Sequence, residues 1–290
     1  MNIVIIDSSP ISFWRFPQKL LNKLESISSD ITYTVVRDVK DLKQSLSQCD
    51  YIIAFSFPKI FIKKNSNLKE IIFLSSGIPS SFTKSTDYKV STLTGLNSKS
   101  VAGHAFHLMM KHLRADIAKV NLIPQVLDNK NIGILGYGAI GSEIHKMLST
   151  LTNTKVMTRK KSTSDNFYNY DNKENFYKDL DYIFMTTSLN EETLKLFKKE
   201  NFFSKLSPSC VIINIARGEL IDEKLLIKHL KENPKSFYLT DVTHPEPYPL
   251  DGALSNHNQV YITKHIAGTF EGIWEDIEFF ITKKVNTWKM

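Results

Sequence analysis

The sequence predicts an α/β protein built around parallel sheets, and three observations support this prediction. Short apolar runs recur along the 290-residue chain, and their lengths are those of buried strands. Stretches with helical spacing separate the runs, and strands that alternate with helices are typical of parallel sheets. The chain is also longer than a usual domain of roughly 100–200 residues. We therefore expect two domains.

The composition is that of a folded globular protein, with 42% hydrophobic and 23% charged residues. No apolar run approaches the ~18 residues of a transmembrane helix, and the first run, residues 3–6, is broken by Asp7. A signal peptide would need a longer apolar stretch after basic residues. We expect a soluble, cytoplasmic protein without a membrane partner.

The charge balance, 37 Lys+Arg against 30 Asp+Glu, gives a net charge of +7, which would permit a nucleic-acid partner. The lysines are scattered, however, and the sequence has no arginine-rich run, zinc-finger spacing or RNA-recognition signature. We therefore expect no nucleic-acid partner. Cys49 and Cys210 lie far apart, so neither a disulfide framework nor a structural zinc site is expected.

Four apolar runs in the first hundred residues are expected to be strands, at residues 3–6, 32–36, 51–55 and 71–74. From Lys99 to about Val120 the chain has no Gly or Pro after Gly103 and carries apolar residues at helical spacing. This stretch is expected to be a helix that connects two domains.

A second strand–helix series follows, with strands expected at residues 132–135, 155–157, 182–185, 211–215, 237–240 and 260–263. Residues 160–178 are polar and rich in Asn, Asp and Tyr, so we expect irregular surface there. A last helix is expected near 270–290, where the apolar residues are Ile273, Trp274, Ile277, Phe280 and Ile281.

A glycine-rich turn follows the strand at 132–135 and has the G-x-G-x-x-G spacing: Gly136, Tyr137, Gly138, Ala139, Ile140 and Gly141. The next helix is indicated by Ile140, Ile144, Met147, Leu148 and Leu151, which are expected to face inward. Gly136 would permit the tight turn, Gly138 the approach of a pyrophosphate, and Gly141 close helix–strand packing. The helix N-terminus would offer N–H groups to the phosphates. A dinucleotide is the favoured ligand, and a glycine turn without a ligand is the alternative.

The end of the following strand bears on the choice of cofactor. NAD enzymes usually have an acidic residue about 20 residues further on, but no acid lies between Glu143 and Asp165. The segment carries Thr158, Arg159 and Lys160 instead. A hydroxyl and a guanidinium would bind a 2′-phosphate through charge-assisted hydrogen bonds. We favour NADP(H), with NAD(H) held through backbone groups as the alternative.

Three further segments follow strands and could meet at the carboxyl edge of a doubly wound sheet, where such sheets bind ligands. They contain N-x-A-R-G-x-x-x-D at 214–222, D-V-x-x-x-E-P at 241–247 and H-x-x-G at 265–268. Arg217, Glu246 and His265 could therefore face one crevice. His244 is the alternative candidate for acid–base chemistry. His104 and His107 lie at i, i+3, but with no third ligand evident we expect no metal.

The glycine-rich turn and these three motifs together resemble the D-isomer-specific 2-hydroxyacid dehydrogenases. They occur in that family's order and roughly at its spacing, over essentially the whole chain. The segment 75–78 looks like the family's substrate loop, and 100–104 like the start of its interdomain helix. The resemblance implies a Rossmann-type doubly wound dinucleotide-binding domain at 99–268. It also implies a smaller flavodoxin-like α/β substrate domain at 1–98 and 269–290. Gly103 and Ser188 depart from the family's usual Glu and Pro.

The resemblance also implies the roles of the site residues. Arg217 would bind the carboxylate and carbonyl oxygen of a 2-oxoacid, and His265 would protonate that oxygen as hydride arrives from the nicotinamide. Glu246 would orient His265 and stabilise its charged form. The implied substrate-binding residues are Ser76, Gly77, Ile78, Arg217 and His265. The implied cofactor-binding residues are Gly136, Tyr137, Gly138, Ala139, Ile140, Gly141, Thr158, Arg159, Lys160, Thr187, Ala216 and Asp241, the last near the nicotinamide carboxamide.

The resemblance implies an NAD(P)-dependent oxidoreductase of small 2-oxoacids such as glyoxylate or hydroxypyruvate, or of D-2-hydroxyacids in reverse. Glu246 argues against formate oxidation, which needs no acid–base residue. One alternative substrate is 3-phosphoglycerate, for which Lys59, Lys63 and Lys64 could supply cations. Another alternative is a non-catalytic, dinucleotide-sensing scaffold like the family's corepressor branch. We expect a homodimer built through the nucleotide domain and no appended regulatory domain.

Overall fold

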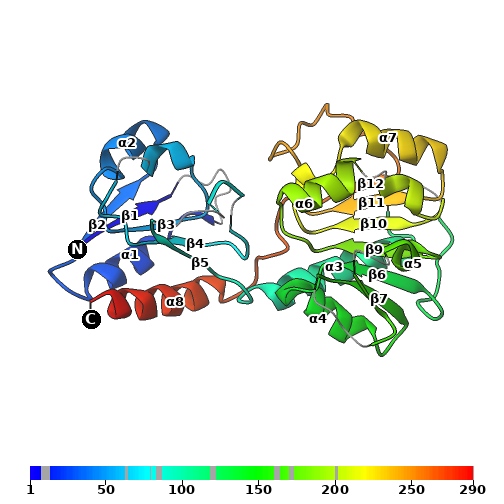
Figure 1. The fold of residues 1–290 in the computed structure, drawn as a ribbon, viewed down its shortest axis with the longest axis horizontal. Coiled ribbons are helices and arrows are strands. Elements are labelled where there is room, and N and C mark those ends of the chain that lie inside the picture. The colour runs from blue at the N-terminus through cyan, green and yellow to red at the C-terminus, as the bar shows by residue number, and fades with distance from the viewer. Residues whose placement is uncertain are drawn as a thin grey trace. The chain divides into compact units, whose positions relative to one another are not determined.

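The computed structural model describes residues 1–7, 14–62, 65–78, 80–82, 87–117, 122–159, 164–169, 173–199 and 202–289. The chain divides into two compact units (Figure 1). Unit 1 is Met1–Asn97 with Phe270–Met290, and unit 2 is Ser98–Thr269. Each unit has a parallel sheet with helices packed on it. The predicted α/β fold class is therefore confirmed.

Unit 1 has a five-stranded parallel sheet in the order β2-β1-β3-β4-β5, which is the flavodoxin-like order. Its strands are β1 (Asn2–Ile6), β2 (Thr32–Val36), β3 (Tyr51–Ala54), β4 (Glu70–Phe73) and β5 (Lys89–Thr92). Helices α1 (Gln18–Glu25) and α8 (Ile273–Trp288) cover one face, and α2 (Leu42–Ser45) packs on the other. The four predicted strands are confirmed. Strand β5 was not predicted, because this edge strand is only partly buried and its sequence, Lys-Val-Ser-Thr, has no apolar run.

Helix α8 returns from the far end of the chain to pack on the sheet of unit 1, which confirms the helix predicted there. Every fourth residue forms its buried stripe: Ile273, Ile277, Ile281 and Val285. The carboxylate of Glu70, on β4, accepts hydrogen bonds from Lys284 Nζ at 2.6 Å and from Trp288 Nε1 at 2.8 Å. These bonds fasten the last turns of α8 to the sheet.

Unit 2 has a seven-stranded parallel sheet in the order β12-β11-β10-β9-β6-β7-β8. Its strands are β6 (Asn131–Leu135), β7 (Asn153–Met157), β8 (Phe167–Tyr168), β9 (Tyr182–Met185), β10 (Val211–Asn214), β11 (Phe237–Thr240) and β12 (Val260–Ile262). Helices α3 (Ser98–Leu113) and α4 (Ala139–Leu148) pack on one face. The other face carries α5 (Lys173–Tyr177), α6 (Glu191–Leu194) and α7 (Glu223–Glu232). The strand order reverses between β6 and β9, which is where doubly wound sheets bind ligands.

Three local predictions in unit 2 are wrong. The segment 160–178 is not irregular surface in its described part, because Phe176 and Tyr177 are 0% and 2% exposed in the core. These two buried aromatic residues were not recognised in the sequence because their neighbours are polar. The connecting helix ends at Leu113 and not near Val120, since Ala115 takes a left-handed backbone with φ 59°. Leu151 lies beyond the end of α4 and is 53% exposed rather than inward-facing.

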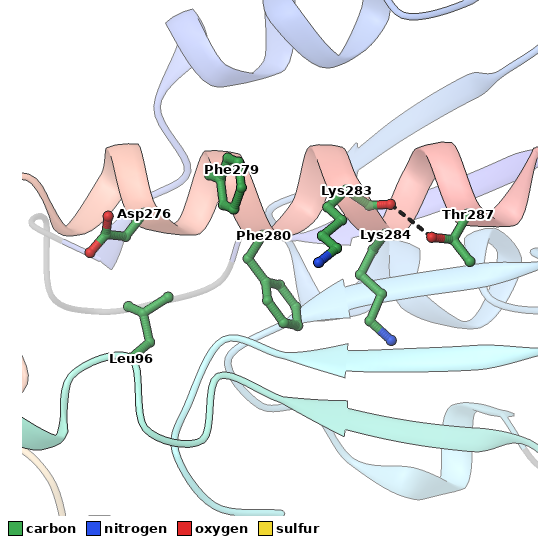
Figure 2. A pocket seen from close by; sticks show the side chains of 7 residues that line it. All are labelled: Leu96, Asp276, Phe279, Phe280, Lys283, Lys284 and Thr287. Carbon is green, nitrogen blue, oxygen red and sulfur yellow. Dashed lines mark hydrogen bonds between the residues drawn. The ribbon is translucent and has the colours of Figure 1, made fainter.

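None of the helices in the described ranges is long and apolar enough to cross a membrane. Unit 1 has a hollow alongside α8 (Figure 2), lined by Leu96, Asp276, Phe279, Phe280, Lys283, Lys284 and Thr287. None of these residues is among the site residues expected from the sequence. The Thr287 hydroxyl is bonded to the carbonyl of Lys283 at 3.0 Å, and Lys284 is engaged by Glu70. The residues expected from the sequence to carry out acid–base chemistry, Glu246 and His265, lie in unit 2.

Candidate active site

The glycine turn after β6 requires glycine at two positions and leaves the third one open. Gly136 has φ +109°, and a Cβ on Gly141 would lie 2.1 Å from the carbonyl oxygen of Gly136, so both positions need glycine. Gly138 precedes α4 as its N-cap without a side-chain cap, and a Cβ there would meet nothing within 4 Å. The N-terminus of α4 therefore faces open space in which a phosphate can approach its N–H groups.

The end of β9 contributes a second indication of a ligand. Thr187 Oγ1 is buried and has no hydrogen-bond partner among the described residues. A buried hydroxyl without a partner is unfavourable, and a bound ligand would supply one. Together with the open approach at Gly138, this hydroxyl shows that the residues present fit a dinucleotide. Tyr137, between the two first glycines, is held by a 3.1 Å hydrogen bond between its hydroxyl and His145 Nδ1.

The segment after β7 presents one described cation beside this turn. Thr158 is 8% exposed, and its backbone N–H donates to the carbonyl of Tyr168 at 2.9 Å. The Arg159 side chain is 70% exposed, and its Nη1 lies 3.7 Å from Glu192 Oε2 on α6. Lys160, the third residue expected here, lies outside the described residues. Arg159 is thus accessible to an anion.

The turn after β10 carries Arg217 and is shaped by a buried asparagine. The Asn214 side chain accepts a hydrogen bond from the N–H of Ala216 at 3.0 Å and donates to the carbonyl of Arg217 at 3.1 Å and to the Tyr238 hydroxyl at 2.9 Å. A Cβ on Gly218 would lie 2.1 Å from the carbonyl carbon of Thr243. Glycine therefore allows the Arg217 turn to pack against the turn after β11.

His265 and Glu246 form a hydrogen-bonded pair at the ends of β12 and β11. His265 Nδ1 lies 2.8 Å from Glu246 Oε2, and the N–H of Thr243 donates to Glu246 Oε1 at 2.9 Å. Both side chains are partly exposed, at 41% for His265 and 36% for Glu246. Among the described residues, His265 Nε2 has no hydrogen-bond partner. This ring nitrogen is therefore available to a substrate.

The electrostatics of the pair favour a charged Glu246. Burial raises the pKa of the Glu246 carboxyl, but the hydrogen bond and charge of His265, the N–H of Thr243 and the charge of Arg217 together outweigh it. The pKa of Glu246 is therefore lowered, and the group is a carboxylate near neutral pH. Such a carboxylate orients the imidazole and stabilises its protonated form.

His244, the alternative acid–base candidate, is not paired with Glu246. Its side chain is 68% exposed, and its Nδ1 lies 3.8 Å from Glu219 Oε1, which is too far for a hydrogen bond. His104 and His107 have ring centroids 5.9 Å apart. Within the described part of the chain, no group of three His, Cys, Asp or Glu residues is arranged to hold a metal ion.

The segment expected to bind substrate follows β4 in unit 1. Ser75 Oγ donates to the carbonyl of Gly77 at 2.9 Å, and Thr94 Oγ1 donates to that of Ser76 at 2.9 Å. These bonds fix the loop, and Ile78 is 40% exposed at its end. Of the lysines considered for a phosphorylated substrate, Lys59 stacks over the Phe82 ring at 5.7 Å, whereas Lys63 and Lys64 lie outside the described residues.

Four residues were not expected to support the site: Asn214 and Tyr238 at the Arg217 turn, Thr263 near Asp241, and His104, which was considered only as a metal ligand. Asn214 had a signal, because it stands inside the N-x-A-R-G motif. His104 and Thr263 are 159 residues apart in the sequence, and no local sequence pattern predicts a contact between residues so far apart.

The fold and the strand-end groups define a class: a dinucleotide-binding α/β protein with a histidine–carboxylate pair on the sheet that carries its glycine turn. The family model described as "D-isomer specific 2-hydroxyacid dehydrogenase, NAD binding domain" matches residues 102–267, more than half of the 290 residues. The chain belongs to this family, which binds a nicotinamide cofactor. The resemblance seen in the sequence is thereby confirmed.

Individual relatives agree with this assignment. A glyoxylate reductase of Pyrococcus furiosus is 33% identical over 151 residues, 50% of this chain and 44% of that protein. The D-3-phosphoglycerate dehydrogenase of Bacillus subtilis is 27% identical over 267 residues, 84% of this chain and 50% of that protein. The chain thus spans about half the length of these curated relatives. An NAD-dependent formate dehydrogenase from Staphylococcus aureus, solved with NAD, has the same fold, with a TM-score of 0.77, 21% identity and coverage of 99% and 95% of the two chains.

Proposed function

We propose that this protein is an NAD(P)-dependent oxidoreductase that reduces small 2-oxoacids of the glyoxylate or hydroxypyruvate type to D-2-hydroxyacids. The observation that carries the proposal is the 2.8 Å bond between His265 and Glu246, on the same sheet as a glycine turn that fits a dinucleotide. Family membership supports hydride transfer with a nicotinamide cofactor. Unit 2 would bind the dinucleotide, and unit 1 would be the substrate domain.

The acid–base step follows from the geometry of the pair. Glu246 holds His265 through Nδ1, so the opposite nitrogen, Nε2, carries the proton that is given to the substrate carbonyl oxygen. When bound, the reduced nicotinamide supplies the hydride to the carbonyl carbon. In the oxidative direction, Nε2 takes the hydroxyl proton, and the carboxylate stabilises the imidazolium that results. Glu246 itself keeps its charge throughout.

Substrate binding would fall to Arg217 and to the loop of unit 1. A guanidinium is planar and permanently charged, and it can bind a 2-oxoacid carboxylate through two parallel hydrogen bonds. The backbone N–H groups of Gly77 and Ile78 would also take part in substrate binding. Lowering the negative charge on the acid in this way also favours arrival of hydride at the neighbouring carbon.

The cofactor preference would depend on Arg159. Its contact with Glu192 is long, at 3.7 Å, and both groups are largely exposed, so the ion pair contributes at most about 1 kcal/mol. A 2′-phosphate, with up to two charges, can displace the carboxylate and bind Arg159 together with the Thr158 hydroxyl. We therefore expect NADP(H) to be preferred over NAD(H).

The nicotinamide end would meet Asp241 and Thr187. A carboxylate has about four acceptor positions, and Asp241 uses three of them for the chain itself. The remaining position can accept from the carboxamide NH₂ group. The buried Thr187 hydroxyl is a second polar group able to bind this end of the cofactor.

The test is a panel of 2-oxoacids assayed with NADPH and with NADH, on the wild-type protein and on His265→Ala. The variant is expected to lose most of its rate while binding the reduced cofactor with nearly unchanged affinity. His244→Ala is the matched control, because His244 lies two residues from Glu246 but is not bonded to it. Equal turnover by wild type and His265→Ala would refute the assignment.

A phosphorylated substrate is the second candidate, because the phosphoglycerate dehydrogenase of Bacillus subtilis matches 84% of the chain. Oxidation of 3-phosphoglycerate belongs in the same panel, with glycerate as the unphosphorylated control. A protein that binds the cofactor but turns over no acid would fit the scaffold alternative instead. Light scattering tests the homodimer, which would have twice the 33.2 kDa mass of the chain.

A further inference from the structure

We infer that Thr263 is a positioning residue for His265, and that it acts together with His104 and Asp241 through one hydrogen-bonded relay. The inference rests on the proposed function, since it assigns to these residues the task of holding the acid–base turn. The relay runs from α3, through the end of β12, to the backbone just after His265. All of its members lie in unit 2.

The centre of the relay is the carboxylate of Asp241, which is 2% exposed. Its Oδ1 accepts from the Thr263 hydroxyl at 2.6 Å and from the N–H of Ile266 at 2.9 Å, and its Oδ2 accepts from the N–H of Ala267 at 2.8 Å. Hydrogen bonds to a buried carboxylate are short and strong. Asp241 therefore binds the two backbone amides that immediately follow His265.

These amides matter because His265 has φ 53°. A left-handed backbone is unfavourable for any residue with a Cβ, and it persists only where neighbouring contacts impose it. The Asp241 carboxylate supplies such contacts on the C-terminal side of His265. If they weaken, the turn can relax and the imidazole moves away from Glu246.

The number of available protons determines whether Thr263 or His104 donates the hydrogen bond between them. The Thr263 hydroxyl has one proton, and its short bond to the Asp241 carboxylate uses that proton. His104 Nε2 lies 3.0 Å from the same hydroxyl oxygen. Since Thr263 cannot also donate to His104, Nε2 must carry a hydrogen and donate to Thr263. The structure thus assigns the Nε2–H tautomer to His104.

A neutral His104 suits this arrangement. Burial lowers the pKa of His104, the charge of Asp241 opposes that shift, and His107 adds to it, so that the net direction is downward. His104 therefore stays neutral near neutral pH and donates a single proton. Its bond orients the Thr263 oxygen so that the hydroxyl proton points to Asp241, which strengthens the next bond in the chain.

The experiment compares Thr263→Val with Thr263→Ser. Valine has the same shape without the hydroxyl, so it removes both bonds of the relay at once, whereas serine keeps them. We expect Thr263→Val to lower kcat about tenfold or more, the effect of losing a hydrogen bond to a charged group, with KM and cofactor Kd within about twofold. Thr263→Ser should restore the rate. A Thr263→Ser variant as impaired as Thr263→Val would overturn the inference.

Two controls separate positioning from general damage. Thr152→Val removes a hydroxyl that donates to the carbonyl of Lys130, in the same unit but away from the relay, and it should leave kcat unchanged. In a His265→Ala background, Thr263→Val should cause no further loss, because the relay acts through His265. A loss as large as in the wild-type background would show that Thr263 acts by another route.

One readout does not depend on turnover. Amide hydrogen exchange at Ile266 and Ala267, followed by NMR, should be about tenfold faster in Thr263→Val, and the ¹⁵N shifts of His104 should report the Nε2–H tautomer. Unchanged exchange at both amides would overturn the inference. If wild type reduces no 2-oxoacid while exchange responds as expected, the proposed function fails and the relay stands.

Discussion

Replacing Glu246 with Gln tests the acid–base pair with the smallest change in shape. The carboxylate makes two separate bonds, one to His265 and one to the N–H of Thr243. A glutamine has only one acceptor oxygen, so it can keep only one of these bonds as acceptor. It also removes the negative charge that stabilises the imidazolium.

The size of the expected loss in rate depends on how exposed Glu246 and His265 are. Exchanging a charge-assisted hydrogen bond for a neutral one costs about 1–2 kcal/mol. Solvent screening reduces this, because both side chains are more than a third exposed, and about 1 kcal/mol is the better figure. The rate of reduction should therefore fall about fivefold.

The direction of the pH effect is also determined. The pKa of Glu246 is lowered, so its carboxylate supports the rate above the ordinary glutamate pKa and is lost only as pH falls through the lowered value. The difference in rate between wild type and Glu246→Gln should therefore shrink in acid. The assay is the pH profile of kcat/KM from the absorbance of the reduced cofactor. An unchanged rate and an unchanged profile would refute the role given to Glu246.

Three further predictions concern cofactor binding, the stability of unit 1 and the packing of the Arg217 turn. Arg159→Ala should weaken NADPH binding about tenfold or more and NADH binding by less than about twofold, measured by fluorescence titration; equal losses would contradict a 2′-phosphate contact. Glu70→Gln should lower the free energy of unfolding by about 2–3 kcal/mol at neutral pH in denaturant titrations, since it removes the buried negative charge that pairs with Lys284. Burial raises the pKa of Glu70, but the hydrogen bonds to its carboxylate and the charge of Lys284 lower it by more, so the net shift is downward. This stability is therefore present above about pH 4.3 and lost as pH falls through the lowered pKa, so the difference from wild type should shrink in acid. Gly218→Ala should reduce both activity and melting temperature, because its Cβ would lie 2.1 Å from the carbonyl carbon of Thr243; a variant with wild-type values would show that the turn yields freely.

The sequence sufficed for those parts of the fold whose pattern is local. Buried strands such as β3, β4 and β10 contain at least three consecutive apolar residues, because both faces of a parallel sheet are covered. The hydrophobic pattern did not predict burial where a residue is buried by partners that its neighbours in the sequence do not indicate. Phe176 fills the core against the ring of Tyr177 at 5.1 Å, yet it stands among polar residues that conceal its role.

The candidate site divides in the same way. Arg217, Glu246 and His265 stand in short motifs, so that their proximity could be expected from the parallel order of the strands. The left-handed backbone of His265 and the end of α3 at Leu113 could not, because they depend on backbone angles that no residue pattern indicates. The bond from Thr94 to Ser76 in the loop after β4 depends on β4 and β5 being neighbours, and β5 itself had no apolar signal.

The groups proposed to react are partly exposed, whereas the groups that hold them in place are buried. Asn214, Thr240 and Asp241 are 0–2% exposed and join the three turns after β10, β11 and β12. The Thr240 hydroxyl lies 3.1 Å from the carbonyl of Asn214 and 2.6 Å from that of Val242. An exposed side chain can keep a productive geometry only if its backbone is held by buried contacts. Substitutions at these buried polar residues should therefore change turnover as much as substitutions at the reacting groups, although none of the three is expected to exchange a proton with substrate.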